Sequence, residues 1–142
     1  FRTKNFEDNI RNLIEALELQ SSIMITDQVP HSKIWGIINK HRVGVIPFRR
    51  TPLTEENTPT KLFEMMICGL ELVVTKLPPA QFFLNNSVHW CDPDNINSIS
   101  RSLISALNAK DDLTNIYENQ RLIKEKYNWE KKQKDYLTLF KA

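Results

Sequence analysis

The fold is decided most clearly around one stretch, Glu56-Asn-Thr-Pro-Thr-Lys-Leu-Phe-Glu64-Met-Met-Ile-Cys-Gly69, in which a polar loop leads into a helix. Asn57 or Thr58 can act as the N-cap of this helix, because their side-chain oxygens accept from free amides. Pro59 suits the first helical position, where its missing N–H costs nothing. Gly69 lies where a left-handed residue commonly ends a helix. The stretch therefore predicts a short, well-delimited helix.

The beginning of this helix is a predicted anion site. The free amides of Thr60 and Lys61, the positive end of the helix dipole and the Lys61 ammonium all favour a negative group such as a phosphate. Glu64 follows about one turn into the helix and stays close to that site. Glu56 precedes Glu64 with seven residues between them.

Outward from this stretch, short apolar runs alternate with amphipathic segments. We expect buried strands over residues 22–26, 43–48, 70–75 and 87–91. We expect helices over about 5–19, from a Ser32 cap to His41, and over about 96–107, 112–126 and 129–141, with a short helix or turn after Pro78 and a loop over 49–58. In the second of these helices, Ile34, Trp35, Ile37 and Ile38 are expected on the inner side. The alternation predicts an α/β fold, a Rossmann-like parallel sheet with helices on both faces, which binds ligands outside the carboxyl ends of its strands.

Composition narrows the function classes. The chain has 142 residues and a net charge of +2, enough for one domain with a core and too little charge to indicate nucleic-acid binding. The residues after Arg121 are rich in lysine but mixed with acidic residues at helical spacing, which is typical of a solvated helix face. A contact with a membrane surface or an acidic partner is the alternative for this region.

Cysteine spacing and hydropathy argue against a metal site and a membrane-spanning segment. Cys68 and Cys91 have no CxxC spacing and no histidine cluster nearby, so we expect no metal site and two reduced, buried thiols. No apolar run is long enough to cross a bilayer, and no leader pattern is present. The sequence starts at Phe1, and we expect it to be a piece of a longer polypeptide.

Several motifs in a fixed order resemble a known family. They are Val29-Pro30-His31, a helix, Val43-Gly-Val-Ile-Pro47, Thr58-Pro-Thr-Lys-Leu-Phe-Glu64 with Gly69, a Val-Val strand, and Tyr127-Asn-Trp-Glu130. In this order they resemble the C-terminal nucleotide-sugar-binding domain of retaining GT-B glycosyltransferases of the group 1 type, which include bacterial cell-surface polysaccharide enzymes. The resemblance implies a single domain over 1–142 that lacks its first strand, helix and strand. It also implies that residues 128–142 form a terminal helix that packs toward an absent N-terminal domain.

The resemblance implies a catalytic pair of carboxylates. Glu64 matches the glutamate that binds the ribose hydroxyls, and Glu56 matches the one that faces the transferred sugar. An ionised carboxylate can accept from two vicinal hydroxyls at once, and such charge-assisted bonds are strong. The alternative for Glu64 is a solvent-facing helix carboxylate. The alternative for Glu56 is an ordinary loop carboxylate beside Glu55.

The resemblance also assigns the donor-binding loops. Asn57, Thr58, Pro59, Thr60 and Lys61 match the loop that lies against the diphosphate and sugar. Val29, Pro30 and His31 match the loop that borders the nucleotide base, with an ordinary surface residue as the alternative for His31. Arg49 and Arg50 suit a diphosphate as guanidinium forks, or alternatively pair with Glu55 and Glu56. Glu71 stands where the family usually has proline.

The implied function is hexose transfer from a UDP-, GDP- or ADP-sugar to a hydroxyl acceptor, with retention and without a prosthetic group or metal. The acceptor, a saccharide or a lipid-linked glycan, is bound mainly by the absent domain, so we expect this chain alone to be inactive. We expect a cytoplasmic protein and leave open a peripheral contact with the inner face of the membrane. Two other classes remain: a degenerate glycosyltransferase kept as a binding module, and an unrelated receiver-like or partner-binding α/β domain.

Overall fold

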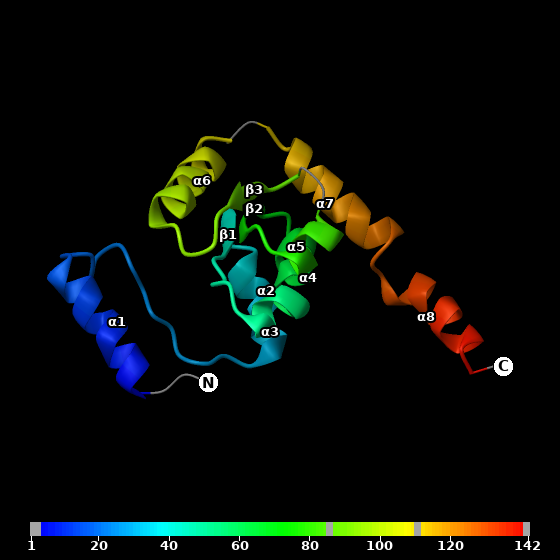
Figure 1. The fold of residues 1–142 in the computed structure, drawn as a ribbon, viewed down its shortest axis with the longest axis horizontal. Coiled ribbons are helices and arrows are strands. Elements are labelled where there is room, and N and C mark those ends of the chain that lie inside the picture. Colours follow the sequence, from blue (N-terminus) through cyan, green and yellow to red (C-terminus); the bar gives the residue numbers. More distant parts are fainter. Residues whose placement is uncertain (1–3, 85–86, 110–111, 141–142) are drawn as a thin grey trace. The chain divides into compact units, whose positions relative to one another are not determined.

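The structure, a computed structural model, describes residues 4–84, 87–109 and 112–140. The chain divides into two compact units, Phe1–Pro30 and His31–Ala142, which we describe separately (Figure 1). Among the described residues, no helix has the length and hydropathy needed to cross a membrane.

Residues 4–30 of the first unit form one helix, α1 (Lys4–Ala16), which the apolar spacing predicted over about 5–19. Glu18, at φ 54°, ends the turn that follows the helix. The strand predicted over 22–26 is wrong, because no strand forms there and Met24 is 82% exposed. A strand needs a neighbouring strand to satisfy its backbone groups, and residues 4–30 contain no second one. The apolar run can form a strand only where a second strand is available for pairing.

The second unit is built on a parallel sheet of three strands in the order β1 (Val43–Ile46), β2 (Glu71–Thr75) and β3 (His89–Cys91). Val45 is paired with Val73, and Val73 with His89. All three strands were predicted, each with slightly longer bounds. Because the strands are parallel, their carboxyl ends meet at one edge of the sheet.

Helices cover both faces of this sheet, which confirms the predicted α/β class (Figure 1). On one face, side chains of α4 (Thr60–Ile67), α5 (Pro78–Phe83) and α7 (Thr114–Glu125) pack with Ile46, Leu72 and Val74. On the other face, α6 (Ile96–Asn108) packs Ala106 against Val73 and Cys91. The alternation of Leu72, Val73 and Val74 between the two clusters follows from the period of a strand.

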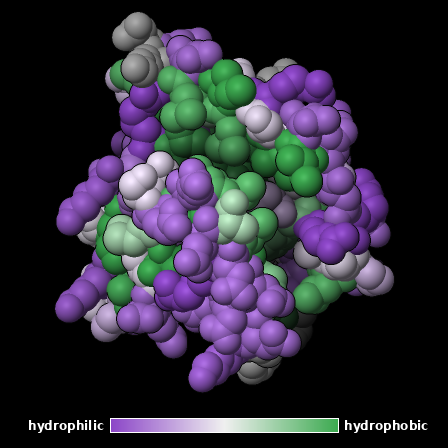
Figure 2. Space-filling model, turned by 90° about the vertical axis from the view of Figure 1, so that its left-hand side faces the viewer, coloured by the Kyte–Doolittle hydropathy of each residue, from purple (hydrophilic) through white to green (hydrophobic). Residues whose placement is uncertain are grey.

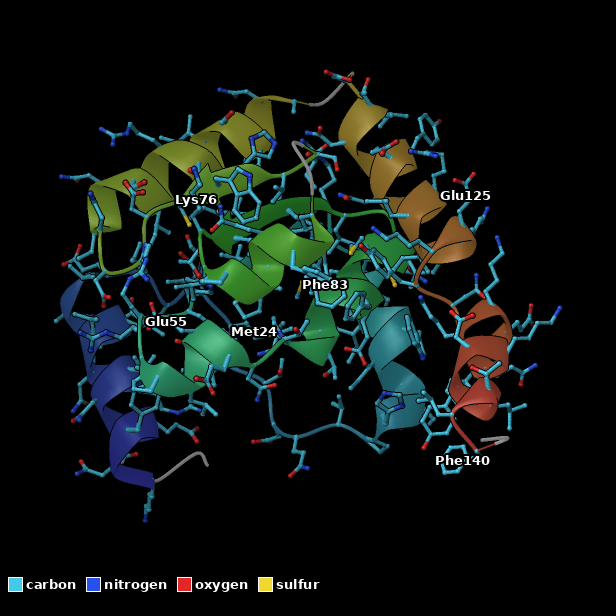
Figure 3. The ribbon with its side chains drawn as sticks, turned by 45° about the vertical axis from the view of Figure 1, so that its right-hand side comes forward. Met24, Glu55, Lys76, Phe83, Glu125 and Phe140 are labelled. Atoms are coloured by element: carbon cyan, nitrogen blue, oxygen red, sulfur yellow. The ribbon has the colours of Figure 1, made fainter. Side chains whose placement is uncertain are left out.

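Three aromatic side chains fix the end of α7 against α4 and α5. The ring centroid of Phe83, which is labelled in Figure 3, lies 5.0 Å from that of Phe63 and 5.1 Å from that of Tyr127. Asn128 then caps α8 (Trp129–Thr138) by accepting from the Lys131 amide. The break predicted at Tyr127 and Asn128 is confirmed. The last helix was expected to continue to about residue 141, which itself lies outside the described residues, but α8 already ends at Thr138.

The helix α2 (His31–Ile38) begins one residue before the predicted Ser32 cap, so that Ser32 lies in its first turn. Two of its four predicted inner residues, Trp35 and Ile37, are 39% and 38% exposed, whereas Ile38 packs against the core. Residues 34, 35, 37 and 38 spread over nearly half of the circumference of α2. A helix that packs on the core along one side buries a narrower stripe, so the residues at the two margins stay exposed. Exposed apolar side chains also occur elsewhere, and Figure 2 shows them as green areas between hydrophilic ones.

Candidate functional site

A cavity of about 330 Å³ lies at the carboxyl edge of the sheet, next to the end of β1. Its lining consists of Phe48, Leu53, Thr54, Asn57, Thr58, Pro59, Thr60 and Lys61. The structure therefore brings all five residues predicted for the donor loop to one cavity. Open parallel sheets bind their ligands at this edge.

The polar loop before α4 contains a helix that was not predicted, α3 (Pro52–Glu56). Thr51 caps α3 by accepting from the Thr54 amide, and the Thr54 hydroxyl in turn accepts from the Thr51 amide. The signal for this helix was present in the sequence, because a threonine cap followed by proline is a common helix start. α3 brings Leu53 and Thr54 to the cavity wall, and sequence reasoning missed both residues together with Phe48.

The predicted N-cap of α4 is wrong. Asn57 ends α3, where its amide donates to the Leu53 carbonyl. Pro59, which was predicted as the first residue of α4, is instead its N-cap. No side chain within the described structure caps this helix. By helix geometry the amides of Thr60 and Lys61 lack intrahelical acceptors. The start of α4 thus presents backbone donors beside the cavity.

The other end of α4 forms as predicted. Gly69 adopts φ +73°, the Gly69 amide donates to the Met66 carbonyl, and the Leu70 amide donates to the Met65 carbonyl. These two bonds form a Schellman motif, which needs a left-handed residue at this place. The motif turns the chain directly into β2.

Lys61 places a positive charge at the cavity. Its Nζ atom lies 5.4 Å from the centroid of the Phe48 ring, within the range of a cation–π contact. Lys61 is exposed, and both residues line the cavity. An ammonium, backbone amides and an aromatic ring are therefore presented to the same space.

Glu64 and His31 come together beside this site. The His31 Nε2 atom lies 3.3 Å from the Glu64 Oε1 atom, and the Glu64 side chain is 22% exposed. Neither residue lines the cavity. Glu64 is four residues beyond Thr60 on α4, so its side chain shares a helix face with a cavity residue. Burial, followed by the charge of Glu64, raises the pKa of the Cys68 thiol, one turn further along.

The remaining predicted residues lie apart from this cavity. Glu56 is exposed at the last position of α3 and does not line the cavity. Val29 and Pro30 belong to the first unit, so the site is described without them. Among the described residues, no group of three or more His, Cys, Asp or Glu side chains gathers as a metal ion requires.

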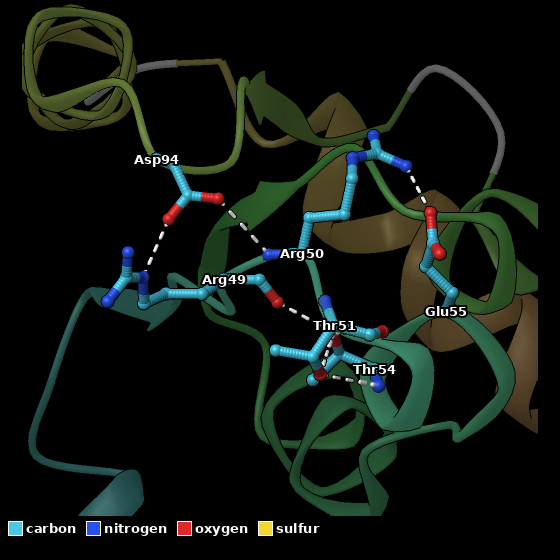
Figure 4. Close-up of polar contacts among 6 residues, drawn as sticks. All are labelled: Arg49, Arg50, Thr51, Thr54, Glu55 and Asp94. Carbon is cyan, nitrogen blue, oxygen red and sulfur yellow. Dashed lines mark hydrogen bonds and ion pairs between the residues drawn. The ribbon is translucent and has the colours of Figure 1, made fainter.

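Two arginines after β1 are held by carboxylates, as Figure 4 shows. Arg50 pairs with Glu55, which is one of the predicted alternatives. Arg49 pairs with Asp94 instead of Glu56, at 2.7 Å from Nε to Oδ1. The hydrogen bond between them raises the pKa of Arg49 and lowers that of Asp94. Asp94 was not predicted, although it lies in the loop that leaves β3 at the same edge.

Two solved structures share this fold. Sucrose-phosphate synthase from Thermosynechococcus elongatus matches with a TM-score of 0.76 at 19% identity, over 95% of this chain and 34% of that chain. A glycosyltransferase from Rickettsia africae ESF-5 matches with a TM-score of 0.78 at 15% identity, over 96% of this chain and 36% of that chain. The chain thus spans about one third of the length of these two structures, and at such identities the likeness concerns the fold.

Sequence comparisons give the family. Among curated proteins, no sequence matches the chain significantly. The model of the family Glycosyl transferases group 1 matches residues 3–129. This match covers the sheet, the cavity and both helices that border it. The chain belongs to the Glycosyl transferases group 1 family.

Proposed function

We propose that this chain is the part of a retaining hexosyltransferase that binds the nucleotide-sugar donor, in the synthesis of cell-surface polysaccharides or other glycoconjugates. The observation that carries the proposal is the cavity lined by Asn57, Thr58, Pro59, Thr60 and Lys61 at the carboxyl edge of the sheet, in a chain of this family. A UDP-, GDP- or ADP-sugar is the donor.

The start of α4 binds the diphosphate of the donor in this proposal. Backbone amides at a helix N-terminus and the helix dipole favour a phosphate. The ammonium of Lys61, held near the Phe48 ring, adds a full positive charge at the same cavity. These groups are in place before the donor arrives, so they stabilise the charge that grows on the departing diphosphate.

Glu64 binds the ribose hydroxyls of the donor, and Glu56 faces the transferred sugar. The partly buried Glu64 side chain supports the first role, because a carboxylate shielded from water forms stronger hydrogen bonds. Its contact with His31 supports a place for His31 at the nucleotide base. Val29 and Pro30 are assigned to the base by the family resemblance of the sequence. Glu56 is exposed, which leaves its carboxylate accessible to a bound sugar.

The acceptor is bound mainly by another domain of a longer protein. The chain spans 34% and 36% of the two solved structures, which supports a donor domain that lacks its partner domain. Residues 128–142 pack toward that domain in this proposal, which the exposed Trp129 and Tyr136 of α8 and the exposed Phe140 after it support. The isolated chain binds donor but transfers no sugar. The protein acts in the cytoplasm, with peripheral contact at the inner membrane face when the acceptor is lipid-linked.

The test is a titration of the chain with UDP, GDP and ADP, each followed by the backbone amide signals in NMR spectra. At least one nucleotide should shift the signals of Thr58, Thr60, Lys61 and Glu64 in a saturable way. The amides of α7, which does not line the cavity, serve as the internal control. The absence of any shift at millimolar concentrations of all three nucleotides would contradict a donor site here.

A further inference from the structure

We propose that Asp94 is a positioning residue that holds the wall of the cavity by tying the loop after β3 to the loop after β1. What the cavity binds rests on the proposed function, whereas the positioning itself is a property of the fold. Asp94 does not line the cavity and is exposed. Its influence is exerted through Arg49 and Arg50 (Figure 4).

The carboxylate of Asp94 makes two contacts with the loop that leaves β1. Its Oδ1 atom accepts from the Arg49 Nε atom at 2.7 Å, and its Oδ2 atom accepts from the Arg50 backbone amide at 3.3 Å. The strands β1 and β3 are not neighbours, because β2 lies between them. Asp94 therefore joins the loops of the two outer strands past the end of the central one.

The same loop is held from its other side by a residue of the cavity wall. The Thr54 hydroxyl donates to the Arg49 carbonyl at 2.6 Å, and the Thr54 amide donates to the Thr51 hydroxyl at 3.2 Å. Thr54 and its neighbour Leu53 line the cavity. A continuous series of hydrogen bonds thus connects Asp94, through the backbone of residues 49–51, to the cavity wall.

The backbone of Asp94 is itself unusual. Its φ is 62°, in the left-handed region that few residues other than glycine adopt, although aspartate and asparagine tolerate it better than most. Unfavourable backbone conformations of this kind persist where the surrounding structure holds them. Here the two bonds to the Arg49 and Arg50 loop, and Asn95 as the side-chain cap of α6, hold it.

The experiment compares Asp94→Asn and Asp94→Gly with the native chain. Asparagine removes the charge but keeps an acceptor and tolerates the left-handed backbone. Glycine removes the side chain and makes that backbone unstrained. Asp112→Asn is the matched control, because Asp112 is also exposed and also accepts from a backbone amide, that of Thr114, at the start of α7.

The first readout is amide hydrogen exchange of Thr54 and Glu55 by NMR, which needs no nucleotide. We expect exchange to become about tenfold faster in Asp94→Gly, less so in Asp94→Asn, and to stay unchanged in Asp112→Asn. In about 1 M KCl the exposed Arg49 pair is screened, so the native chain should approach Asp94→Asn while Asp94→Gly changes little. Unchanged exchange of Thr54 and Glu55 in both Asp94 variants would overturn the inference.

The second readout is the dissociation constant of whichever of UDP, GDP or ADP binds the native chain. We expect it to rise about threefold to tenfold in Asp94→Gly, and not in Asp112→Asn, since a displaced wall weakens binding without removing a contact. Equal affinity of native chain and Asp94→Gly would overturn a role in binding. If no nucleotide binds the native chain, the proposed function fails, and hydrogen exchange alone still decides whether Asp94 positions the wall.

Discussion

The Nε2 atom of His31 lies 3.3 Å from the Oε1 atom of Glu64, so the first residue of α2 meets the second turn of α4. The two residues are 33 positions apart in the sequence. One oxygen of Glu64 therefore has a partner within the chain. A carboxylate offers about four lone-pair sites, so Glu64 can keep this contact and still accept from the hydroxyls of a ribose.

Glu64→Gln should weaken nucleotide binding about tenfold. A hydrogen bond to a charged group contributes about 1.5–3 kcal/mol against about 1 kcal/mol for a neutral one, and about 1.4 kcal/mol corresponds to a factor of ten. Isothermal titration calorimetry with the nucleotide that binds the native chain measures this change.

Glu118→Gln is the control for this measurement, because Glu118 lies on α7, pairs with Arg121 and does not line the cavity. His31→Ala should change the affinity less than threefold, since the His31 side chain is 72% exposed and exposed pairs contribute little. If Glu64→Gln binds as tightly as Glu118→Gln, Glu64 makes no charged contact with the nucleotide.

Local signals in the sequence were sufficient for the sheet and for most helices. The apolar run that forms β2 was predicted correctly, because a fully buried strand requires a nearly continuous run of apolar residues. The helix end at Gly69 was predicted correctly, because a left-handed backbone favours glycine. The strand expected over 22–26 failed for the opposite reason. Its formation depends on a partner strand, which no local pattern reports.

The sequence indicated five residues of the cavity lining but not the geometry in which they are held. Asn57 and Pro59 were expected to start α4, and a helix that ends at Asn57 was overlooked, because the tertiary structure decides which of two adjacent helices a polar residue caps. Asp94 was missed because its partners, Arg49 and Arg50, are more than forty positions away, 45 and 44 respectively. Contacts between loops of different strands follow from the topology of the sheet, not from spacing along the chain.

Gly69→Ala should destabilise the chain by about 2 kcal/mol. A left-handed backbone costs about 1–2 kcal/mol for a residue with a Cβ atom, and here that atom would lie 2.9 Å from the Gln120 Nε2 atom. Gln120 would have to move, although its Nε2 atom donates to the Ile67 carbonyl. Urea unfolding followed by circular dichroism measures the loss.

Gly36→Ala is the matched control for Gly69→Ala. Gly36 lies inside α2, and a Cβ atom there would meet no atom within 4 Å. Alanine should therefore stabilise the chain, by up to about 1 kcal/mol, because glycine is a poor residue in a helix interior. Equal effects of the two substitutions would show that backbone conformation does not decide the cost at Gly69.

His89→Leu should destabilise the chain by about 3 kcal/mol. Glu71 is 2% exposed, and its Oε2 atom lies 3.1 Å from the His89 Nε2 atom, while its Oε1 atom has no partner within the described structure. Removal of His89 leaves the Glu71 carboxyl with the Asn115 Nδ2 atom, which donates to the same Oε2 atom at 3.3 Å. Loss of one member of a buried charged pair costs about 3–5 kcal/mol, and the remaining bond from Asn115 places the expected cost at the lower end. The free energy of unfolding in urea measures this effect.

The double variant Glu71→Leu with His89→Leu completes a double-mutant cycle. It should be more stable than His89→Leu alone, because the buried carboxyl that lost its histidine partner is gone and similar volumes are filled. Additive effects of the two single substitutions would mean that the contact between Glu71 and His89 contributes nothing of its own.

Arg49→Gln should raise the pKa of Asp94 toward its ordinary value of 3.8. The bond from Arg49 is the largest cause of the lowered pKa, and the bond from the Arg50 amide is the next, so part of the lowering should remain. Because the pKa is lower in the folded chain than in the unfolded one, the ionised carboxylate stabilises the fold above the unfolded pKa. This contribution is lost as the pH falls through the folded pKa.

NMR titration of the Asp94 carboxyl carbon from pH 2 to pH 6 follows the shift of the Asp94 pKa. Asp112 is the control, since its pKa is lowered by hydrogen bonds from Thr114 and should not respond to Arg49→Gln. If Asp94 titrates at the same pH in both chains, the two loops are not joined through the guanidinium of Arg49.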